Sequence, residues 1–150
     1  MKNIILIIFL FLIYSCGYTS IYKNLGNQNF QINITEMQGD TKMNNLIKKE
    51  INLHSNKDSL YIFDVLVKTD YIKKVLVKDN SGTITDYEIY TNSTFTINFE
   101  EKIKVITFSE TINIKNQTDN FAQDMYEKSI RRNFASSIRE KLISEITNIK

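Results

Sequence analysis

Alternation of apolar and polar residues along the chain predicts four β-strands. A first strand is expected over residues 30–37, and a second over 60–77, the longest stretch rich in β-forming residues. Residues 79–82 (Asp-Asn-Ser-Gly) have the composition of a hairpin turn, so a third strand is expected to follow over 83–99. A second tight turn then leads into a fourth strand over 103–114. These segments predict a β-rich middle for the chain.

Two of these strands depart from simple alternation. The second has apolar residues on both faces: Tyr61, Phe63, Val65 and Val67 on one, and Leu60, Ile62 and Leu66 on the other. This surplus exceeds what helices on one face can cover, and surplus apolar surface is typical of a partner site. The alternative is a sheet with some ordinary exposed apolar side chains. In the fourth strand the apolar positions switch parity between Val105 and Ile106, which predicts a bulge or a break.

Two segments have helical periodicity. Asp40 or Thr41 is expected to cap a short helix whose apolar positions are Met43, Leu46, Ile47, Ile51 and Leu53. Thr118 or Asp119 is expected to cap a long amphipathic helix. Its apolar residues fall four apart: Ala122, Tyr126, Ile130, Phe134, Ile138, Leu142 and Ile146, with Phe121, Met125, Ala135 and Ile149 alongside. Its charged residues are expected to form a solvated face: Arg131, Arg132, Arg139, Glu140, Lys141 and Glu145.

The order of predicted elements is β-α-β-β-β-α. This order predicts an α+β fold, a small four-stranded and mostly antiparallel sheet with two helices packed on one face. By length the chain after its leader forms a single domain, and we assign that domain to residues 30–150.

The N-terminus has the pattern of a secretory leader. Lys2 precedes an unbroken apolar run over residues 4–14, which is shorter than the roughly 20 residues needed to span a bilayer. Ser15 and Cys16 follow, and the segment resembles a bacterial lipobox, in which the cysteine thiol receives a diacylglyceryl group. Tyr14 is bulkier than that pattern usually carries. The alternative is an ordinary signal peptide with an incidental cysteine.

Lipidation gives residues 1–29 a simple organisation. Residues 1–15 are then a lipoprotein signal peptide, and 16–29 a tether between the lipid on Cys16 and the folded domain. Several acyl chains anchor a protein stably, whereas one does so only marginally. Gly17 stands where an aspartate would favour retention at the inner membrane, so we expect the outer membrane.

Composition and charge exclude some classes of function. Of 19 basic side chains, removal of Lys2 leaves 18, against 17 acidic ones. A mature chain close to neutrality argues against a nucleic-acid binder, which should carry a basic face. His54 is the only histidine and lies in a region expected to be a polar loop, without a cluster of metal ligands. No phosphate-binding glycine loop or nucleophile elbow occurs, so we expect neither an enzyme nor a cofactor.

Taken together, these features resemble the lipopolysaccharide-assembly lipoprotein LptE family. The resemblance begins at Cys16-Gly17-Tyr18-Thr19 and Ile21-Tyr22. It continues through the short helix after Gly39-Asp40, the hairpin over residues 79–82 and the alternation Thr85-Asp86-Tyr87-Glu88-Ile89, to the segment containing Thr118, Phe121, Tyr126, Glu127, Ile130 and Ala135. It covers nearly the whole mature chain but rests on order and pattern. Ser20 stands where Thr-Pro is frequent in the family.

The resemblance implies a place and a partner. Members of the family sit inside an outer-membrane β-barrel of the LptD type, plug it, help it fold and contact lipopolysaccharide during its export. Phosphates need cations, and antiparallel strands bring Lys78 and Lys115 to one end of the sheet. We therefore hypothesise that Lys78 and Lys115, with Lys73 or Lys74, contact the lipopolysaccharide phosphates. The alternative is four solvated lysines in a lysine-rich chain.

Two other functions remain open. A generic outer-membrane lipoprotein that binds a small ligand or peptidoglycan would be isolated as a monomer. A lipid-anchored hydrolase would need a catalytic constellation that the sequence does not show.

Overall fold

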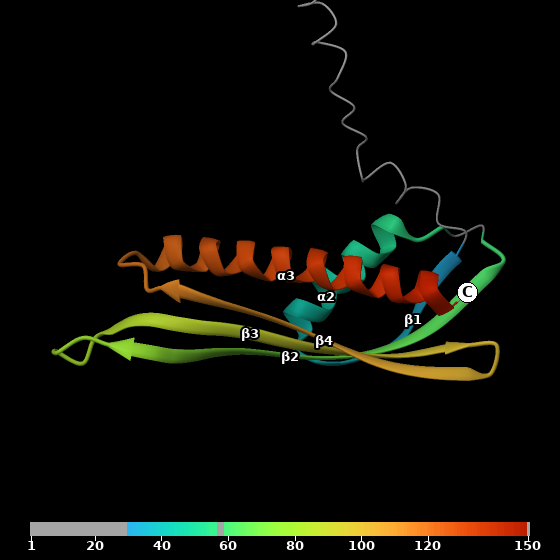
Figure 1. The fold of residues 1–150 in the computed structure, drawn as a ribbon. Coiled ribbons are helices and arrows are strands. Elements are labelled where there is room, and N and C mark those ends of the chain that lie inside the picture. The colour runs from blue at the N-terminus through green and yellow to red at the C-terminus, as the bar shows by residue number, and fades with distance from the viewer. Residues whose placement is uncertain (1–29, 57–58, 150) are drawn as a thin grey trace, which may run out of the picture.

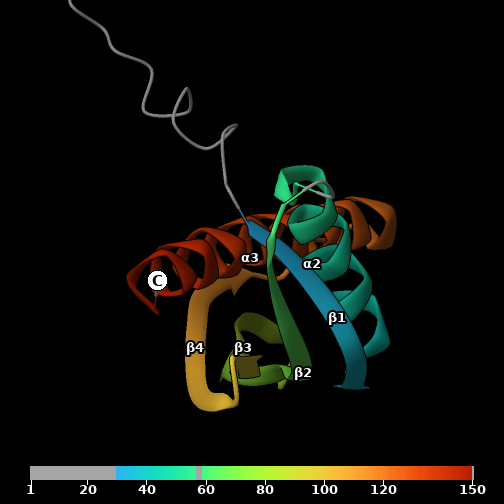
Figure 2. The same ribbon diagram turned by 90° about the vertical axis from the view of Figure 1, so that its right-hand side faces the viewer.

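The computed structural model describes residues 30–56 and 59–149. The elements follow the order β1 (Phe30–Gly39), α2 (Thr41–His54), β2 (Tyr61–Lys78), β3 (Ile84–Phe99), β4 (Lys102–Lys115) and α3 (Asn120–Ile149). The strands form one sheet in the order β1-β2-β3-β4, in which β1 runs parallel to β2 and the other neighbours are antiparallel. Both helices lie on the same side of that sheet (Figures 1 and 2). The predicted α+β class and element order are confirmed.

The hydrophobic core lies between the helices and the covered face, the sheet face that they pack against. Because successive side chains of a strand point to opposite faces of the sheet, Phe63, Val65 and Val67 of β2 all lie on this face. Phe95 and Ile97 of the neighbouring strand β3 lie beside them and are also buried. The buried apolar side chains from the helices are Met43, Ile47 and Ile51 of α2, and Ile130, Phe134, Ala135, Ile138, Leu142, Ile143 and Ile146 of α3. Most of the apolar helix positions predicted from the sequence are therefore buried and stabilise the fold, whereas Ala122 and Tyr126 at the start of the predicted α3 stripe are exposed.

A close approach of two strands fixes where α2 begins. Gly39 ends β1 with φ of 90°, and a Cβ there would lie 2.0 Å from the Thr69 carbonyl oxygen. Asp40 then donates its backbone N–H to the same oxygen at 2.8 Å. The Asp40 side chain accepts from the Met43 N–H at 2.7 Å, so Asp40 is the N-cap of α2. Asp119 caps α3 in the same way by accepting from the N–H groups of Phe121 and Ala122.

The irregularities in the strands lie elsewhere than the sequence predicted. The predicted bulge in the fourth strand is wrong, because β4 pairs with β3 without interruption from Lys102 to Lys115. The parity switch arises because Ile103 and Val105 lie on the open face, the side of the sheet away from the helices, where both are exposed. The register shifts instead between Ile34 and Glu36 in β1, and between Val75 and Lys78 in β2.

Two expectations about the helices also need correction. Arg139 does not belong to a solvated face, because its side chain is only 5% exposed and lies near Glu50. Its neighbours on α3, Ile138 and Leu142, are buried too. Arg139 is enclosed because α3 packs against α2, the helix that carries Glu50. His54 is the last residue of α2 rather than part of a loop, and its Nδ1 lies 2.9 Å from the Glu50 carbonyl oxygen. Leu53, expected on the apolar stripe, is exposed.

Candidate functional site

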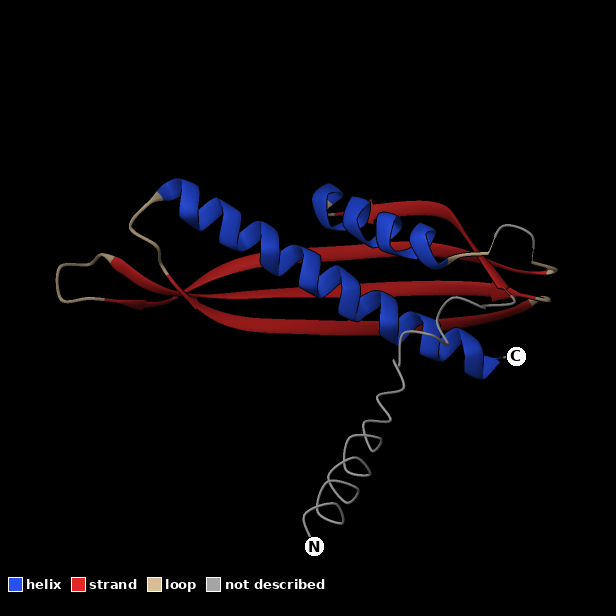
Figure 3. Ribbon diagram, turned by 90° about the horizontal axis from the view of Figure 1, so that it is seen from above, coloured by secondary structure: helices blue, strands red, loops and turns tan. Residues whose placement is uncertain are grey.

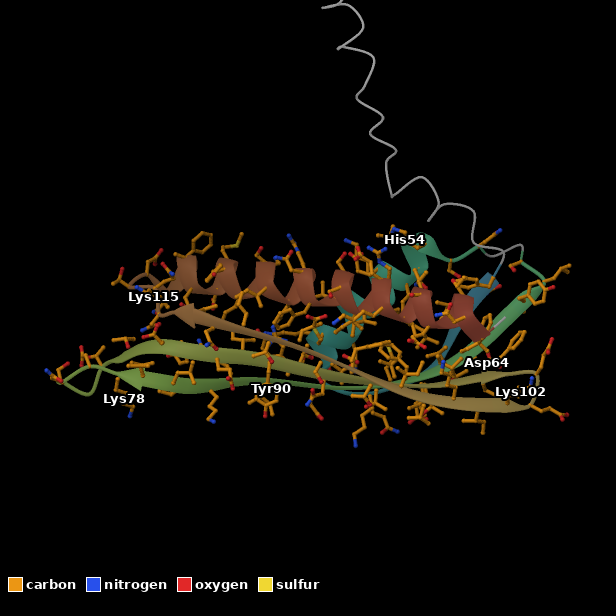
Figure 4. The ribbon with its side chains drawn as sticks, in the orientation of Figure 1. His54, Asp64, Lys78, Tyr90, Lys102 and Lys115 are labelled. Carbon is orange, nitrogen blue, oxygen red and sulfur yellow. The ribbon has the colours of Figure 1, made fainter. Side chains whose placement is uncertain are left out.

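The register places Lys78 and Lys115 at the same end of the sheet. Asp86 of β3 pairs with Val77 of β2 on one side and with Lys115 of β4 on the other, and Lys78 pairs with Ile84. Both lysines are exposed, and both stand at the end opposite to Asp64 and Lys102 (Figure 4). We call this the projecting end, because only α3, and not α2, lies over it (Figure 3).

The other two candidate lysines differ from each other. Lys74 pairs with Glu88 in the ladder and is exposed. Lys73 lies on the covered face, where its ammonium bonds to the Glu127 carboxylate of α3 and stands 3.9 Å from the centre of the Tyr87 ring. Lys73 therefore joins β2 to α3, and its charge is already compensated. Within the described residues Lys74, Lys78 and Lys115 form no ion pair, although Glu88 and Asp86 stand opposite Lys74 and Lys115 in the strand ladder.

The hairpin at the projecting end is held by one carboxylate. Oδ1 of Asp79 accepts hydrogen bonds from the Ser81 hydroxyl at 2.6 Å and from the backbone N–H groups of Ser81 and Thr83. The Ser81 hydroxyl bond, followed by the Thr83 backbone bond, lowers the pKa of Asp79. Gly82, with φ of 84°, completes the turn. These hydrogen bonds and the Gly82 conformation together fix the backbone of the turn that follows Lys78.

Apolar side chains are exposed beside these lysines. Val75, Leu76 and Val77 of β2 are each about two-fifths to one-half exposed, at 39%, 40% and 50%. Phe121 at the start of α3 is 73% exposed, and Met125 is 50% exposed, although both were expected to support its apolar stripe. Cations next to apolar surface are the combination that an amphiphilic anion requires.

The linker into α3 ties that helix to the projecting end. Asn116 donates its backbone N–H to the Thr85 carbonyl and its side-chain amide to the Ile84 carbonyl. Gln117 donates its N–H to Oε1 of Gln123, which is buried in the first turns of α3. These bonds hold the start of α3 beside the beginning of β3.

Sequence reasoning missed a charged cluster between α3, α2 and the covered face. Arg131 donates from Nη1 to Oδ1 of Asp40 at 2.9 Å, and its guanidinium carbon lies 3.3 Å from the centre of the Tyr71 ring. One turn earlier on α3, Glu127 accepts from Lys73 and from Nε2 of Gln123. Asp40 and Arg131 are 91 positions apart in sequence. Only the spacing of Glu127 and Arg131 on one helical face could have pointed to this cluster.

The cluster perturbs two ionisable groups. Burial alone would raise the pKa of Glu127, but hydrogen bonds from Lys73 and Gln123 and the charges of Lys73 and Arg131 outweigh burial and lower it. Burial raises the pKa of the Tyr71 phenol, partly opposed by the Arg131 charge. The Tyr71 hydroxyl is buried and has no hydrogen-bond partner in the described part of the chain. The cluster therefore favours the ionised form of Glu127, and burial favours the neutral form of Tyr71.

Some predictions cannot be compared with this geometry. The leader, Cys16 and the tether lie outside the described residues. Across residues 30–56 and 59–149, no three His, Cys, Asp or Glu side chains come together in a manner suited to a metal ion. The described helices include none with an apolar stretch sufficient to cross a bilayer.

Comparison with known proteins identifies the fold. No protein-family model matches the sequence, and no curated protein matches it. The structure is similar to that of rare lipoprotein B from Shewanella oneidensis, with a TM-score of 0.54 and 12% identity over 78% of this chain and 98% of that one. It is also similar to a Caulobacter crescentus protein described as a lipoprotein, with a TM-score of 0.57 and 5% identity over 84% and 92%. The chain thus has the fold of bacterial lipoproteins of the rare lipoprotein B type.

Proposed function

We propose that this chain is an outer-membrane lipoprotein, anchored through acylated Cys16, that plugs a β-barrel translocon of the LptD type. In that position it helps the barrel assemble and assists delivery of lipopolysaccharide to the cell surface, without catalysing a reaction. The observation that carries the proposal is the projecting end, where Lys78 and Lys115 lie beside exposed apolar side chains on a lipoprotein fold. Lipopolysaccharide offers phosphates to such cations and acyl chains to such apolar surface.

The open face of the sheet supports a protein partner. The register places Leu66, Thr96 and Val105 in one row across three strands, and Asp64, Asn98 and Ile103 in the next. Ile62, Ile103 and Val105 are each more than half exposed. We propose that this end of the open face contacts the inner wall of the barrel, since several large apolar side chains exposed on one face are typical of an interaction site.

The partner is tested by recovering the tagged lipoprotein from outer membranes in mild detergent. The proposal expects a large β-barrel protein to co-purify in equal amount, and Ile103→Asp with Val105→Asp to reduce that yield. Recovery of the wild-type chain as a free monomer would overturn the barrel proposal. It would favour instead a generic envelope lipoprotein that binds a small ligand or peptidoglycan.

The lipopolysaccharide contact is tested by a charge reversal at the projecting end. Lys78→Glu with Lys115→Glu should weaken lipopolysaccharide binding at least about tenfold, because two charge-assisted contacts become repulsive. Lys48→Glu with Lys102→Glu makes the same change in net charge at exposed lysines elsewhere and should leave binding nearly unchanged. Equal binding by both double variants would refute the assignment of Lys78 and Lys115.

A further inference from the structure

A groove between the two helices forms a second cationic site, distinct from the projecting end. The groove has a volume of about 590 Å³ and is lined by α2 on one side and α3 on the other. A groove of this size falls within the usual range for small-ligand sites. Its lining residues are Lys42, Asn45, Leu46 and Lys49 from α2, and Asp124, Glu127, Lys128 and Arg131 from α3. Each set has the spacing i, i+3, i+4, i+7, so each helix turns one continuous face toward the groove.

The charges in this groove are unbalanced. Its lining carries four cations against two carboxylates. Arg131 is paired with Asp40, and Glu127 is paired with Lys73 from the covered face. Among the described residues no acidic side chain pairs with Lys42, Lys49 or Lys128, and Asp124 is the one lining carboxylate without an ion-pair partner. Three uncompensated ammonium groups therefore face one uncompensated carboxylate.

The start of α2 adds to the positive potential. The first turn of α2 contains Lys42 and no acidic residue. The Asp40 carboxylate, which caps the helix, is itself bonded to Arg131. Lys42 therefore adds a positive charge at this end of the groove that no acidic residue of the same turn offsets.

The spread of the cations indicates the class of ligand. Lys42 and Lys49 are seven residues apart, which corresponds to about 10 Å along a helix axis. A single phosphate would have to draw both flexible side chains toward one point, whereas two linked phosphates can each meet one ammonium group without that convergence. We propose that the groove between α2 and α3 binds an anion carrying two or more phosphate groups, either a soluble oligophosphate or the headgroup of a phospholipid. This inference does not depend on the barrel or on the lysines of the projecting end.

The test measures binding to the full chain in non-ionic detergent by isothermal titration calorimetry. The first probe is inorganic tripolyphosphate, and the second is cardiolipin in mixed micelles, which carries two phosphates. Binding of tripolyphosphate identifies a soluble source of the ligand, and binding of cardiolipin alone identifies a headgroup. Both results support the proposal, and binding of neither probe overturns it. Because the contact is ionic, added salt should weaken it.

Matched variants locate the site. Lys42→Gln, Lys49→Gln and Lys128→Gln together should weaken binding at least about tenfold, because each removes a charge-assisted contact. Lys74→Gln, Lys78→Gln and Lys115→Gln remove three exposed lysines at the projecting end and should leave binding unchanged. Equal losses in the two triple variants would mean a diffuse charge effect and would overturn the site. The two sets also separate this inference from the lipopolysaccharide contact, which should depend on the second set alone.

A variant that should strengthen anion binding, rather than weaken it, provides a further check. Asp124→Asn removes the uncompensated carboxylate and should strengthen binding several-fold, whereas Asp70→Asn, an exposed carboxylate on β2, should have no effect. Each is an exposed single-atom replacement, so both variants should fold. Unchanged or weakened binding in Asp124→Asn would contradict the proposed electrostatics.

Discussion

The two ends of the sheet are built from the same strands but have opposite properties. At the packed end, Phe63 is fully buried between Phe99, stacked at 4.3 Å, and Phe30, in edge contact at 5.7 Å. At the projecting end the same strand exposes Val75, Leu76 and Val77. Sequence of the same β-forming kind therefore serves as core where both helices cover the sheet and as accessible surface where only α3 lies above it. The comparison teaches that the part of the strand that stabilises the fold is separate from the part proposed to bind a ligand, so that the two can be altered independently.

The largest expected effect contrasts one apolar residue from each end. Phe63→Ala should lower the free energy of unfolding by about 3–5 kcal/mol, because it opens a cavity at a fully buried position. Val77→Ala, at a half-exposed position of the same strand, should cost less than about 1 kcal/mol. Urea unfolding followed by circular dichroism measures both values. Similar losses in the two variants would contradict the separation of the two ends.

The next effect compares the two described glycines with positive φ. Gly39→Ala should destabilise the fold by about 3 kcal/mol, since the new Cβ meets the Thr69 carbonyl as well as an unfavourable backbone conformation. Gly82→Ala should cost only about 1 kcal/mol, because a Cβ there has open space around it and only the backbone strain remains. The same unfolding measurement applies, and a larger loss at Gly82 would refute the role given to the Thr69 contact.

A smaller effect concerns the charged cluster and depends on pH. The pKa of Glu127 is lowered from its ordinary value of 4.5, so its stabilising contribution is complete above that pH and is lost as the pH falls through the folded-state pKa. Glu127→Gln should therefore cost about 1–2 kcal/mol at neutral pH. The difference from wild type should shrink in acid. Glu101→Gln, in the exposed turn, is the control, and a pH-independent difference for Glu127→Gln would argue against the ionic contact.

The smallest effect, and one of unusual sign, is expected at Arg139. Its Nε and Nη1 are buried without hydrogen-bond partners among the described residues, and its nearest approach to Glu50 is 3.9 Å. Only Nη2 is bonded, to Ser136 and Glu140. Arg139→Met keeps much of the volume and removes a buried charge with two unsatisfied nitrogens, so stability should stay within about 1 kcal/mol of wild type or rise. Glu50→Gln should be destabilising, because the guanidinium then loses a compensating charge. A loss of several kcal/mol in Arg139→Met would show that the guanidinium is well satisfied.

The periodicities of the sequence determined the elements and their order. The alternation in β2 and β3, the turn residues 79–82 and the spacing of four in α3 predicted each element to within a few residues, because local geometry sets these patterns. Antiparallel pairing also predicted that Lys78 and Lys115 would reach one sheet end. These features follow from which residues are neighbours along a helix or strand.

Only the tertiary structure decided which charges are solvated and which are enclosed. Nothing local distinguishes Arg139, which is buried, from Arg132, which is exposed, or pairs Arg131 with Asp40 across most of the chain. The parity switch at Val105 indicated a bulge, whereas it reflects apolar residues on a face that no helix covers. The groove between α2 and α3 likewise exists only because the sheet sets two helices side by side. Burial and long-range pairing depend on what packs above a residue, and a single sequence does not contain that information locally.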